Sequence, residues 1–331
     1  MKLRSHPRST PPPVRLLLWL LLLAPNFTAP RAAAQLPTPV ILYRTEFEFS
    51  EGYRTTAELA GQNNWIAAGS GGSGILTNAL AGQGQQAYIG FSAPTAPDDY
   101  VALFRPLNFT PLQNGLPVVR FTVLMNVIDS TTGGRDSFRW SVYNTNATRL
   151  LSLDFDNETR AICYHLEAGT NFISTGYGFT TNATYRLEII LNFQRNRWSA
   201  LLGDTEIVTL QPITTQNTPL TLGDIDAVYF VHNPATPGDN YMIFDGYTVT
   251  AEAIANTSPV LVPVAYDRAG PFTFSAFVEP LVPYTLEASD DLRQWRFLEA
   301  YISPDASFDF RDTTALPGDR ARFYRIRLPN P

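Results

Sequence analysis

Three acidic side chains at alternating positions, Asp154, Asp156 and Glu158, come nearest to a catalytic motif in this chain of 331 residues. Alternate residues of a β-strand share one face, so a strand through all three would align carboxylates as glycoside hydrolysis requires. Residues 156–159, Asp-Asn-Glu-Thr, instead have the composition of a hairpin turn, which would take Glu158 off that face. We therefore predict an ordinary hairpin and assign no catalytic residue.

The histidines and the single cysteine predict no further reactive site. Of the three histidines, His6 lies in the predicted leader, and His165 and His232 are far apart in the sequence and have no Cys or His neighbour at the spacing of zinc ligands. A Ser-His-Asp triad would need one of them, and neither is accompanied by a G-x-S-x-G motif. Cys163 lies in the strand-like run 161–166, where a buried and unreactive thiol is expected, and it has no partner for an internal disulfide.

Loop aspartates are the one indication of a metal. The weak calcium candidates are Asp98, Asp99, Asp239 and Asp245. Carboxylate oxygens in loops suit hard cations such as calcium. Loop aspartates more commonly accept backbone hydrogen bonds in turns. We expect no cofactor, with calcium as the alternative.

Five polar side chains on predicted strands are candidates for ligand binding: Arg139, Tyr143, Asp154, Arg186 and Glu188. Each falls at a position that the alternation directs away from the core. Arg, Asp and Glu hydrogen-bond sugar hydroxyls and an aromatic ring stacks on a sugar face, although any solvated sheet carries the same residue types. We predict that these five line one groove of the first domain.

The elements that would position these residues are β-strands. Between residues 185 and 209, apolar Leu187, Ile189 and Leu191 alternate with polar residues, and two short polar breaks divide the segment into a meander. Similar runs recur between Gly, Pro, Asn and Asp, which predicts an all-β protein. The other strands predicted in the first domain are residues 46–50, 85–91, 100–104, 118–128, 138–143, 151–155, 161–167, 227–232 and 241–250. The glycine-rich run 69–74 lacks the Lys-Ser/Thr of a phosphate loop and is expected to be a flexible surface loop.

Several segments carry a family resemblance. They are residues 59–62 (LAGQ) with Trp65, 86–90 (QAYIG), 153–156 (LDFD), the meander ending at Trp198, and 238–245 (GDNYMIFD). Together they resemble the concanavalin A-like (laminin-G-like) jelly-roll module of secreted bacterial proteins over about residues 40–252. The resemblance implies a β-sandwich of two packed antiparallel sheets with one concave face. Members include sugar binders, glycosidases and structural modules, and the glycosidases carry Glu-x-Asp-x-Glu where this chain begins with Asp154.

A second, smaller domain is predicted after a linker at residues 253–263. Its predicted strands, within residues 264–331, are 272–277, 284–289, 295–298, 307–310 and 322–328. Residues 284–289 (YTLEAS), Trp295 and 322–327 (RFYRIR) are similar to a small C-terminal β-sandwich, fibronectin-like in shape, of secreted bacterial proteins. Nothing in that resemblance implies catalysis. In the last strand, Tyr324, Ile326 and Leu328 are predicted to face the core.

Residues 1–34 are predicted to be a signal peptide. Four basic residues precede nine apolar residues at 16–24, and Ala32-Ala33-Ala34 suits a signal peptidase. The apolar run is much shorter than the about 20 residues that span a membrane. We expect secretion of a disulfide-free monomer without membrane insertion, with a jelly roll covering residues 35–252.

The net charge of the chain disfavours some classes of partner. The chain has a net charge of −6, and removal of the basic leader makes it more acidic, which disfavours nucleic acid and anionic membranes as partners. We predict a non-catalytic protein that binds carbohydrate or an extracellular surface component. A polysaccharide-degrading glycoside hydrolase and a structural spacer of an envelope or matrix are the alternatives.

Overall fold

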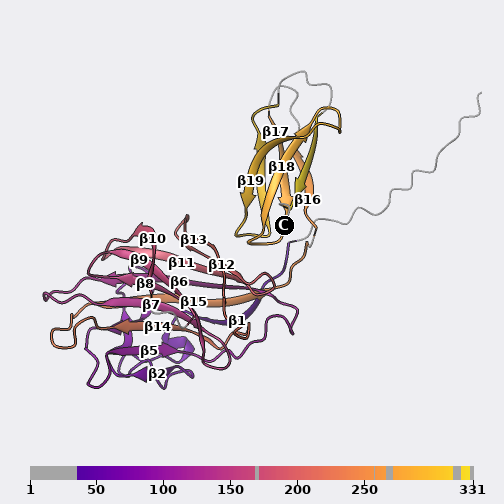
Figure 1. The fold of residues 1–331 in the computed structure, drawn as a ribbon. Coiled ribbons are helices and arrows are strands. Elements are labelled where there is room, and N and C mark those ends of the chain that lie inside the picture. The colour runs from indigo at the N-terminus through magenta and orange to yellow at the C-terminus, as the bar shows by residue number, and fades with distance from the viewer. Residues whose placement is uncertain (1–35, 168–170, 257, 266–270, 316–321, 329–331) are drawn as a thin grey trace, which may run out of the picture. The chain divides into compact units, whose positions relative to one another are not determined.

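The computed structural model describes residues 36–328 except 168–170, 257, 266–270 and 316–321 (Figure 1). The predicted signal peptide lies outside these residues. Among the described residues, the one helical element is the 3-10 turn η1 (Phe49–Glu51), and no helix is long and apolar enough to cross a membrane. The regular structure is otherwise made of β-strands, which confirms the all-β prediction.

The first domain consists of two antiparallel sheets, here called sheet A and sheet B. Sheet A has the order β13 (Thr205–Gln211), β12 (Arg197–Leu202), β11 (Thr184–Asn192), β6 (Val118–Ile128), β15 (Tyr241–Glu252), β4 (Gln85–Gly90) and β3 (Ser73–Thr77), with β1 (Val40–Thr45) also paired to β15. Sheet B has the order β10 (Ile173–Gly178), β9 (Ala161–Leu166), β8 (Arg149–Asp156), β7 (Ser137–Tyr143), β14 (Asp224–Phe230), β5 (Tyr100–Phe104) and β2 (Ile66–Gly69).

The core lies between the inner faces of these sheets. Along β6 and β7 every second residue is a large apolar side chain, and these residues meet across the layer. The rings of Phe121 and Trp140 have centroids 5.0 Å apart, and Trp140 meets Phe244 edge to face at 5.4 Å. Aromatic pairs of this geometry add to the hydrophobic gain of burial, so they hold the two sheets together. The predicted jelly-roll sandwich is confirmed.

The segment 46–50 is not a strand, contrary to the prediction. It leads from β1 into η1, and the Glu51 carboxylate accepts hydrogen bonds from the backbone N–H groups of Glu46 and Glu48, both at 3.0 Å. These bonds close a turn over a sequence whose alternation indicated an extended chain. The carboxylate therefore overrides the strand pattern.

The glycine-rich run 69–74 is not a flexible surface loop either. Gly69 ends β2, and Ser73 and Gly74 begin β3. A Cβ added at Gly69 would collide with the Tyr100 carbonyl, and one added at Gly72 with the Gly90 carbonyl. These glycines are needed because neighbouring backbone passes too close for any side chain.

The C-terminal strands form two small sheets, which confirms the predicted second sandwich. Their orders are β16 (Val260–Ala265), β17 (Phe272–Phe277), β20 (Ser307–Asp312) and β19 (Arg296–Ile302), β18 (Pro283–Ser289), β21 (Phe323–Arg327). Tyr324 and Ile326 pack against its core as predicted, whereas Leu328 is 50% exposed and the prediction for it is wrong. Strand β16 takes up part of the segment predicted as a linker, and the domain boundaries remain a prediction.

Candidate functional site

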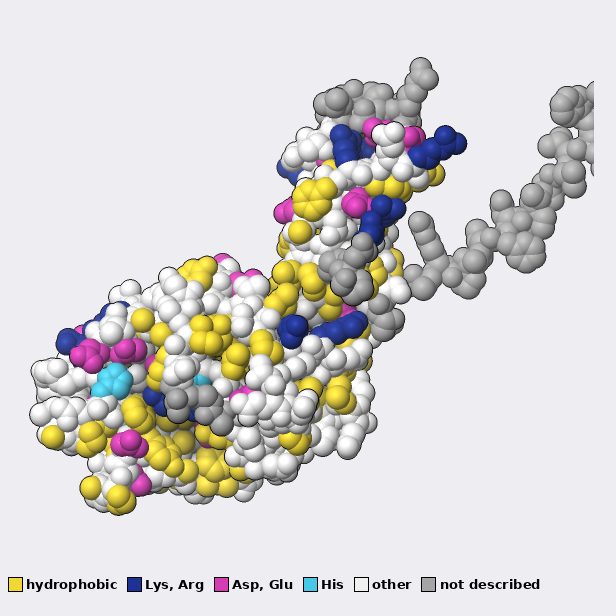
Figure 2. Space-filling view, viewed as in Figure 1, with side chains coloured by type: hydrophobic (Ala, Val, Ile, Leu, Met, Phe, Trp, Pro, Cys, Tyr) yellow, Lys and Arg dark blue, Asp and Glu magenta, His cyan; other side chains and the backbone are white. Residues whose placement is uncertain are grey.

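Sheet B turns a polar face away from the core, and we call it the outer face of sheet B. It is formed by alternate residues of β7, β8 and β14, namely Ser137, Arg139, Ser141, Tyr143, Ser152, Asp154, Asp156, Asp224, Asp226, Val228 and Phe230. The strand register aligns them in rows: Arg139 lies between Val228 and Asp154, and Ser141 between Asp226 and Ser152. Figure 2, viewed as Figure 1, shows acidic, histidine and apolar side chains interspersed over this part of the molecule.

An ion pair lies at the centre of this face. The Arg139 Nε donates to the Asp154 Oδ1 at 2.5 Å, and Asp154 is only 2% exposed. Burial raises the pKa of Asp154 above its usual value, although the neighbouring guanidinium opposes the rise. The sequence predicted both residues for ligand binding, and the structure brings them together. Asp154 is thereby engaged in orienting Arg139.

Aromatic rings flank the Arg139 guanidinium. Its central carbon lies 4.3 Å from the centroid of the Phe230 ring and 5.1 Å from that of Phe172. Such contacts hold a guanidinium over a ring face by cation–π attraction. Phe172 is 45% exposed and Tyr100, across from Phe230 in β5, is 38% exposed. Rings therefore remain available to a ligand beside the cation.

A second acidic group lies further along β14. Burial and the neighbouring Asp224 raise the pKa of Asp226 well above its usual value, and burial also raises the pKa of Asp224. Asp226 is 5% exposed, and its Oδ1 has no hydrogen-bond partner among the described residues. Tyr143 lies opposite Asp224 on β7, and its own pKa is raised, chiefly by burial. Together these side chains offer donors and acceptors to a ligand with hydroxyl groups.

Sequence reasoning missed the two β14 acids and both phenylalanines. The pattern Asp224-Ile225-Asp226-Ala227 already alternates, so a strand started at Asp224 instead of Ala227 would have placed both acids outward. No comparable signal existed for Phe172, because its contact with Arg139 depends on the tertiary fold.

Arg186 and Glu188 do not belong to this site, so the five predicted residues do not line one groove. Both lie on β11, which is in sheet A next to β6. Glu188 accepts hydrogen bonds from Arg186 at 2.9 Å and from Arg120 at 3.1 Å, and Arg120 also pairs with Glu252 at 3.1 Å. The grouping failed because alternation shows which residues point outward but not from which sheet.

The acidic run 154–158 forms the predicted hairpin. Asp156 Oδ1 accepts the Glu158 N–H at 2.9 Å, and its Oδ2 accepts the Thr159 hydroxyl at 2.6 Å. The turn 157–159 carries Glu158 off the strand, as expected. These carboxylates are not aligned as a glycosidase pair.

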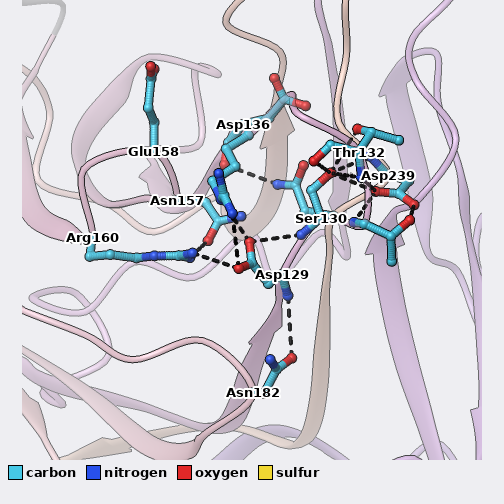
Figure 3. A network of polar contacts seen from close by, with 12 residues as sticks. Asp129, Ser130, Thr132, Asp136, Asn157, Glu158, Arg160, Asn182 and Asp239 are labelled. Carbon is cyan, nitrogen blue, oxygen red and sulfur yellow. Dashed lines mark hydrogen bonds and ion pairs between the residues drawn. The ribbon is translucent and has the colours of Figure 1, made fainter.

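The calcium candidates are spread over three places. Asp98 and Asp99 precede β5, Asp239 precedes β15, and Asp245 lies within β15. Asp239 accepts hydrogen bonds from Ser130, Thr131 and Thr132, which hold its pKa far below the usual value (Figure 3). Within the described residues no group of three or more His, Cys, Asp or Glu is placed to hold a metal ion. Calcium binding stays a prediction.

Cys163 and His165 lie on the outer side of β9. The Cys163 thiol is only partly buried, contrary to the prediction of a buried thiol, but this burial still raises its pKa, so its reactive thiolate is disfavoured. His165 is 4% exposed and meets the Phe172 ring edge to face, with centroids 3.6 Å apart. Both side chains serve packing beside the site.

Comparisons with known proteins give distant likenesses only. No protein-family model matches the sequence, and a search of curated proteins yields no match. Among similar solved structures, a sialidase has 11% identity and a TM-score of 0.44 over 63% of this chain, which spans 18% of that chain. A GH131 β-glucanase catalytic domain from Podospora anserina has 12% identity and a TM-score of 0.42, over 63% of this chain and 95% of the other. The lectin UEA-II, complexed with galactose, has 8% identity and a TM-score of 0.41, over 66% of this chain and 99% of the other. The fold of this chain is therefore shown by its own strand pairing alone.

Proposed function

We propose that the outer face of sheet B binds carbohydrate and that this recognition is the function of the first domain. The observation that carries the proposal is the fixed Arg139 guanidinium, which is oriented by Asp154 at 2.5 Å and by two rings. A preoriented cation beside exposed aromatic rings suits sugars, because hydroxyl groups accept its hydrogen bonds while the apolar sugar face stacks on a ring.

The geometry also indicates which donors are available. Among the described residues, the one hydrogen bond found for the Arg139 side chain runs from its Nε to Asp154. Its Nη groups are therefore available to ligand oxygens. Rigid strands place such groups better than loops do, which favours a defined ligand orientation.

Binding to a glycan array, followed by calorimetry on the best ligand, tests the proposal. We expect dissociation constants of about micromolar to millimolar, since single sugar contacts are weak. Arg139→Ala and Asp154→Asn should each weaken binding about tenfold or more, which corresponds to about 1.4 kcal/mol. The matched control is Arg186→Ala, which removes an arginine that also pairs with an acid but lies on sheet A. Equal losses for Arg186→Ala and Arg139→Ala, or undiminished binding by Arg139→Ala, would place the ligand elsewhere.

We further propose that the protein is exported and acts outside the cell. The support is the basic and apolar leader at residues 1–34. The intact mass of the exported protein should correspond to a chain starting at residue 35. A membrane-bound species that keeps residues 16–24 would contradict this.

A further inference from the structure

Three side chains that are distant in the sequence meet at one end of the outer face of sheet B. Ser137 is the first residue of β7, His232 follows β14, and Glu158 lies in the turn between β8 and β9. The Ser137 Oγ is 2.7 Å from His232 Nε2, and His232 Nδ1 is 3.5 Å from Glu158 Oε2. Each imidazole nitrogen thus faces one partner, a hydroxyl on one side and a carboxylate on the other.

This arrangement selects one form of the histidine. In the neutral ring, the Glu158 carboxylate, 3.5 Å from Nδ1, favours the tautomer with its proton on Nδ1, because the negative charge attracts that N–H. Nε2 then carries the lone pair, and the Ser137 hydroxyl donates to it. The order of nucleophile, general base and orienting carboxylate is that of serine hydrolases. We propose that Ser137, His232 and Glu158 form a catalytic site that hydrolyses esters of short-chain acids.

Buried groups hold the backbone of His232, and Glu158 lies beside its ring. Asp136 is 1% exposed, and it accepts hydrogen bonds from the His232 N–H at 3.0 Å, the Tyr229 hydroxyl at 2.8 Å and the Gly238 N–H at 2.8 Å. These bonds fix the backbone of the base. Figure 3 shows the Glu158 side chain pointing away from the network of Asp129 and Arg160, so its carboxylate is left for His232.

The surroundings determine the size of the substrate. A pocket of about 220 Å³ is lined by His232 and Glu158, together with Gly133, Gly134, Arg135, Asp136, Asn233 and Thr236. Ser137 is 1% exposed and is not among the lining residues, so the proposal requires a short acyl group, such as acetyl, that reaches the hydroxyl past the His232 ring. The alcohol part of the ester would lie over the adjoining outer face. That this alcohol is a sugar rests on the proposed function, whereas ester hydrolysis itself does not.

The proposed ester hydrolysis needs water as its only co-reactant. The Ser137 Oγ attacks the ester carbonyl carbon while its proton passes to His232 Nε2. The bond to the alcohol oxygen then breaks, and His232 returns the proton to that oxygen. Water attacks the acyl-serine and gives a proton to Nε2, the bond to Oγ breaks, and Ser137 regains its proton as the acid leaves. Glu158 stabilises the positive imidazolium through its negative charge, 3.5 Å from Nδ1.

The test begins with the full-length wild-type protein. A fluorophosphonate probe, which reacts covalently with activated serines, should add its mass to the peptide that contains Ser137. The protein should also hydrolyse 4-nitrophenyl acetate faster than 4-nitrophenyl butyrate. Relative to wild type, kcat/KM for the acetate should fall about 100-fold or more in Ser137→Ala and His232→Ala, and about tenfold in Glu158→Gln. Ser275→Ala, which removes a hydrogen-bonded serine of the second domain, should keep the wild-type rate.

Two results would overturn the proposal. The first is an unlabelled Ser137 in the folded wild-type protein, a measurement that does not depend on any variant folding. The second is a Ser137→Ala protein that hydrolyses the acetate at the wild-type rate, which would assign the activity to the histidine alone. Loss of glycan binding in Arg139→Ala with serine labelling retained would leave this site standing. Labelling of Ser137 and binding of glycan can therefore be lost independently of each other.

Discussion

Asp245 gives the sharpest prediction of stability. This carboxyl is 1% exposed within β15, and burial raises its pKa from 3.8 to about 7, with Glu46, Glu48 and Glu51 adding to the rise. The folded protein therefore holds a proton that the unfolded chain releases above about pH 4. Stability should consequently fall as the pH rises from about 4 to 7, and the penalty should be constant above pH 7.

The magnitude follows from the separation of the two pKa values. About three pH units at 1.36 kcal/mol each set an upper bound of about 4 kcal/mol. The bond that the Gly246 N–H donates to the carboxylate at 2.8 Å is already included in this bound. Relaxation of the fold around an ionised group lowers such a penalty, so we expect about 2 kcal/mol. Asp245→Asn removes the ionisation and keeps the shape. The Asp245→Asn protein should have the same free energy of unfolding as wild type near pH 4. At pH 8 its free energy of unfolding should be about 2 kcal/mol higher than that of wild type.

Urea unfolding of both proteins at pH 4.5, 6 and 8 measures this difference. Asp204→Asn, a change of an exposed turn residue between β12 and β13, is the matched control and should show no such trend. A difference that is independent of pH, or an Asp245→Asn protein less stable than wild type at pH 8, would contradict this prediction. The second outcome would mean that the ionised carboxylate has a favourable partner in solution, such as a cation.

Two further predictions concern the scaffold around the site. Gly72→Ala should destabilise the protein by about 3 kcal/mol in urea unfolding, because the added methyl would meet the Gly90 carbonyl, whereas Gly133→Ala, with nothing within 4 Å, should be nearly neutral. Glu167→Gln should cost about 2 kcal/mol, since the buried carboxylate accepts the N–H groups of Thr215 at 2.7 Å and Gln216 at 2.9 Å. Hydrogen bonds from the Thr214 and Thr215 hydroxyls, together with these backbone bonds, hold the Glu167 pKa below its usual 4.5 despite burial. The loss should therefore be full above that pH and shrink as the pH falls, and a loss that persists unchanged at pH 3 would contradict the role of the charge.

Strands with a marked apolar or alternating sequence were predictable, and strands without one were not. Strand β6 has the predicted bounds because apolar residues occupy every second position along it, and β5 has them because its residues are all apolar. Strand β2 (Ile66–Gly69) reads IAAG and β10 (Ile173–Gly178) reads ISTGYG, so neither shows a buried and an exposed face in its residue types. Such strands form because the neighbouring strand offers hydrogen bonds, which is a property of the assembled sheet.

The candidate site was predictable only where it depends on the pattern within a single strand. Outward orientation of Arg139 and Asp154 follows from the alternation of their own strands. The separation of Arg186 and Glu188 from them follows from the pairing of β11 with β6, which is long-range and leaves no local trace. The meeting of Ser137, His232 and Glu158 is likewise a product of the fold, since a turn and two strand ends supply one residue each.

The position of β15 also bears on how the jelly roll forms in time. This strand pairs with β6 and β4 on its two sides, and its later residues pair with β1, so that Val40 lies opposite Ala251. A chain made from its N-terminus holds β1, β4 and β6 without their common neighbour until residues 241–252 have been synthesised. Pairings between such distant segments form slowly and leave strand edges exposed in the meantime. A nascent chain that stops before β15 would therefore be a target for aggregation or proteolysis and not a smaller version of the domain.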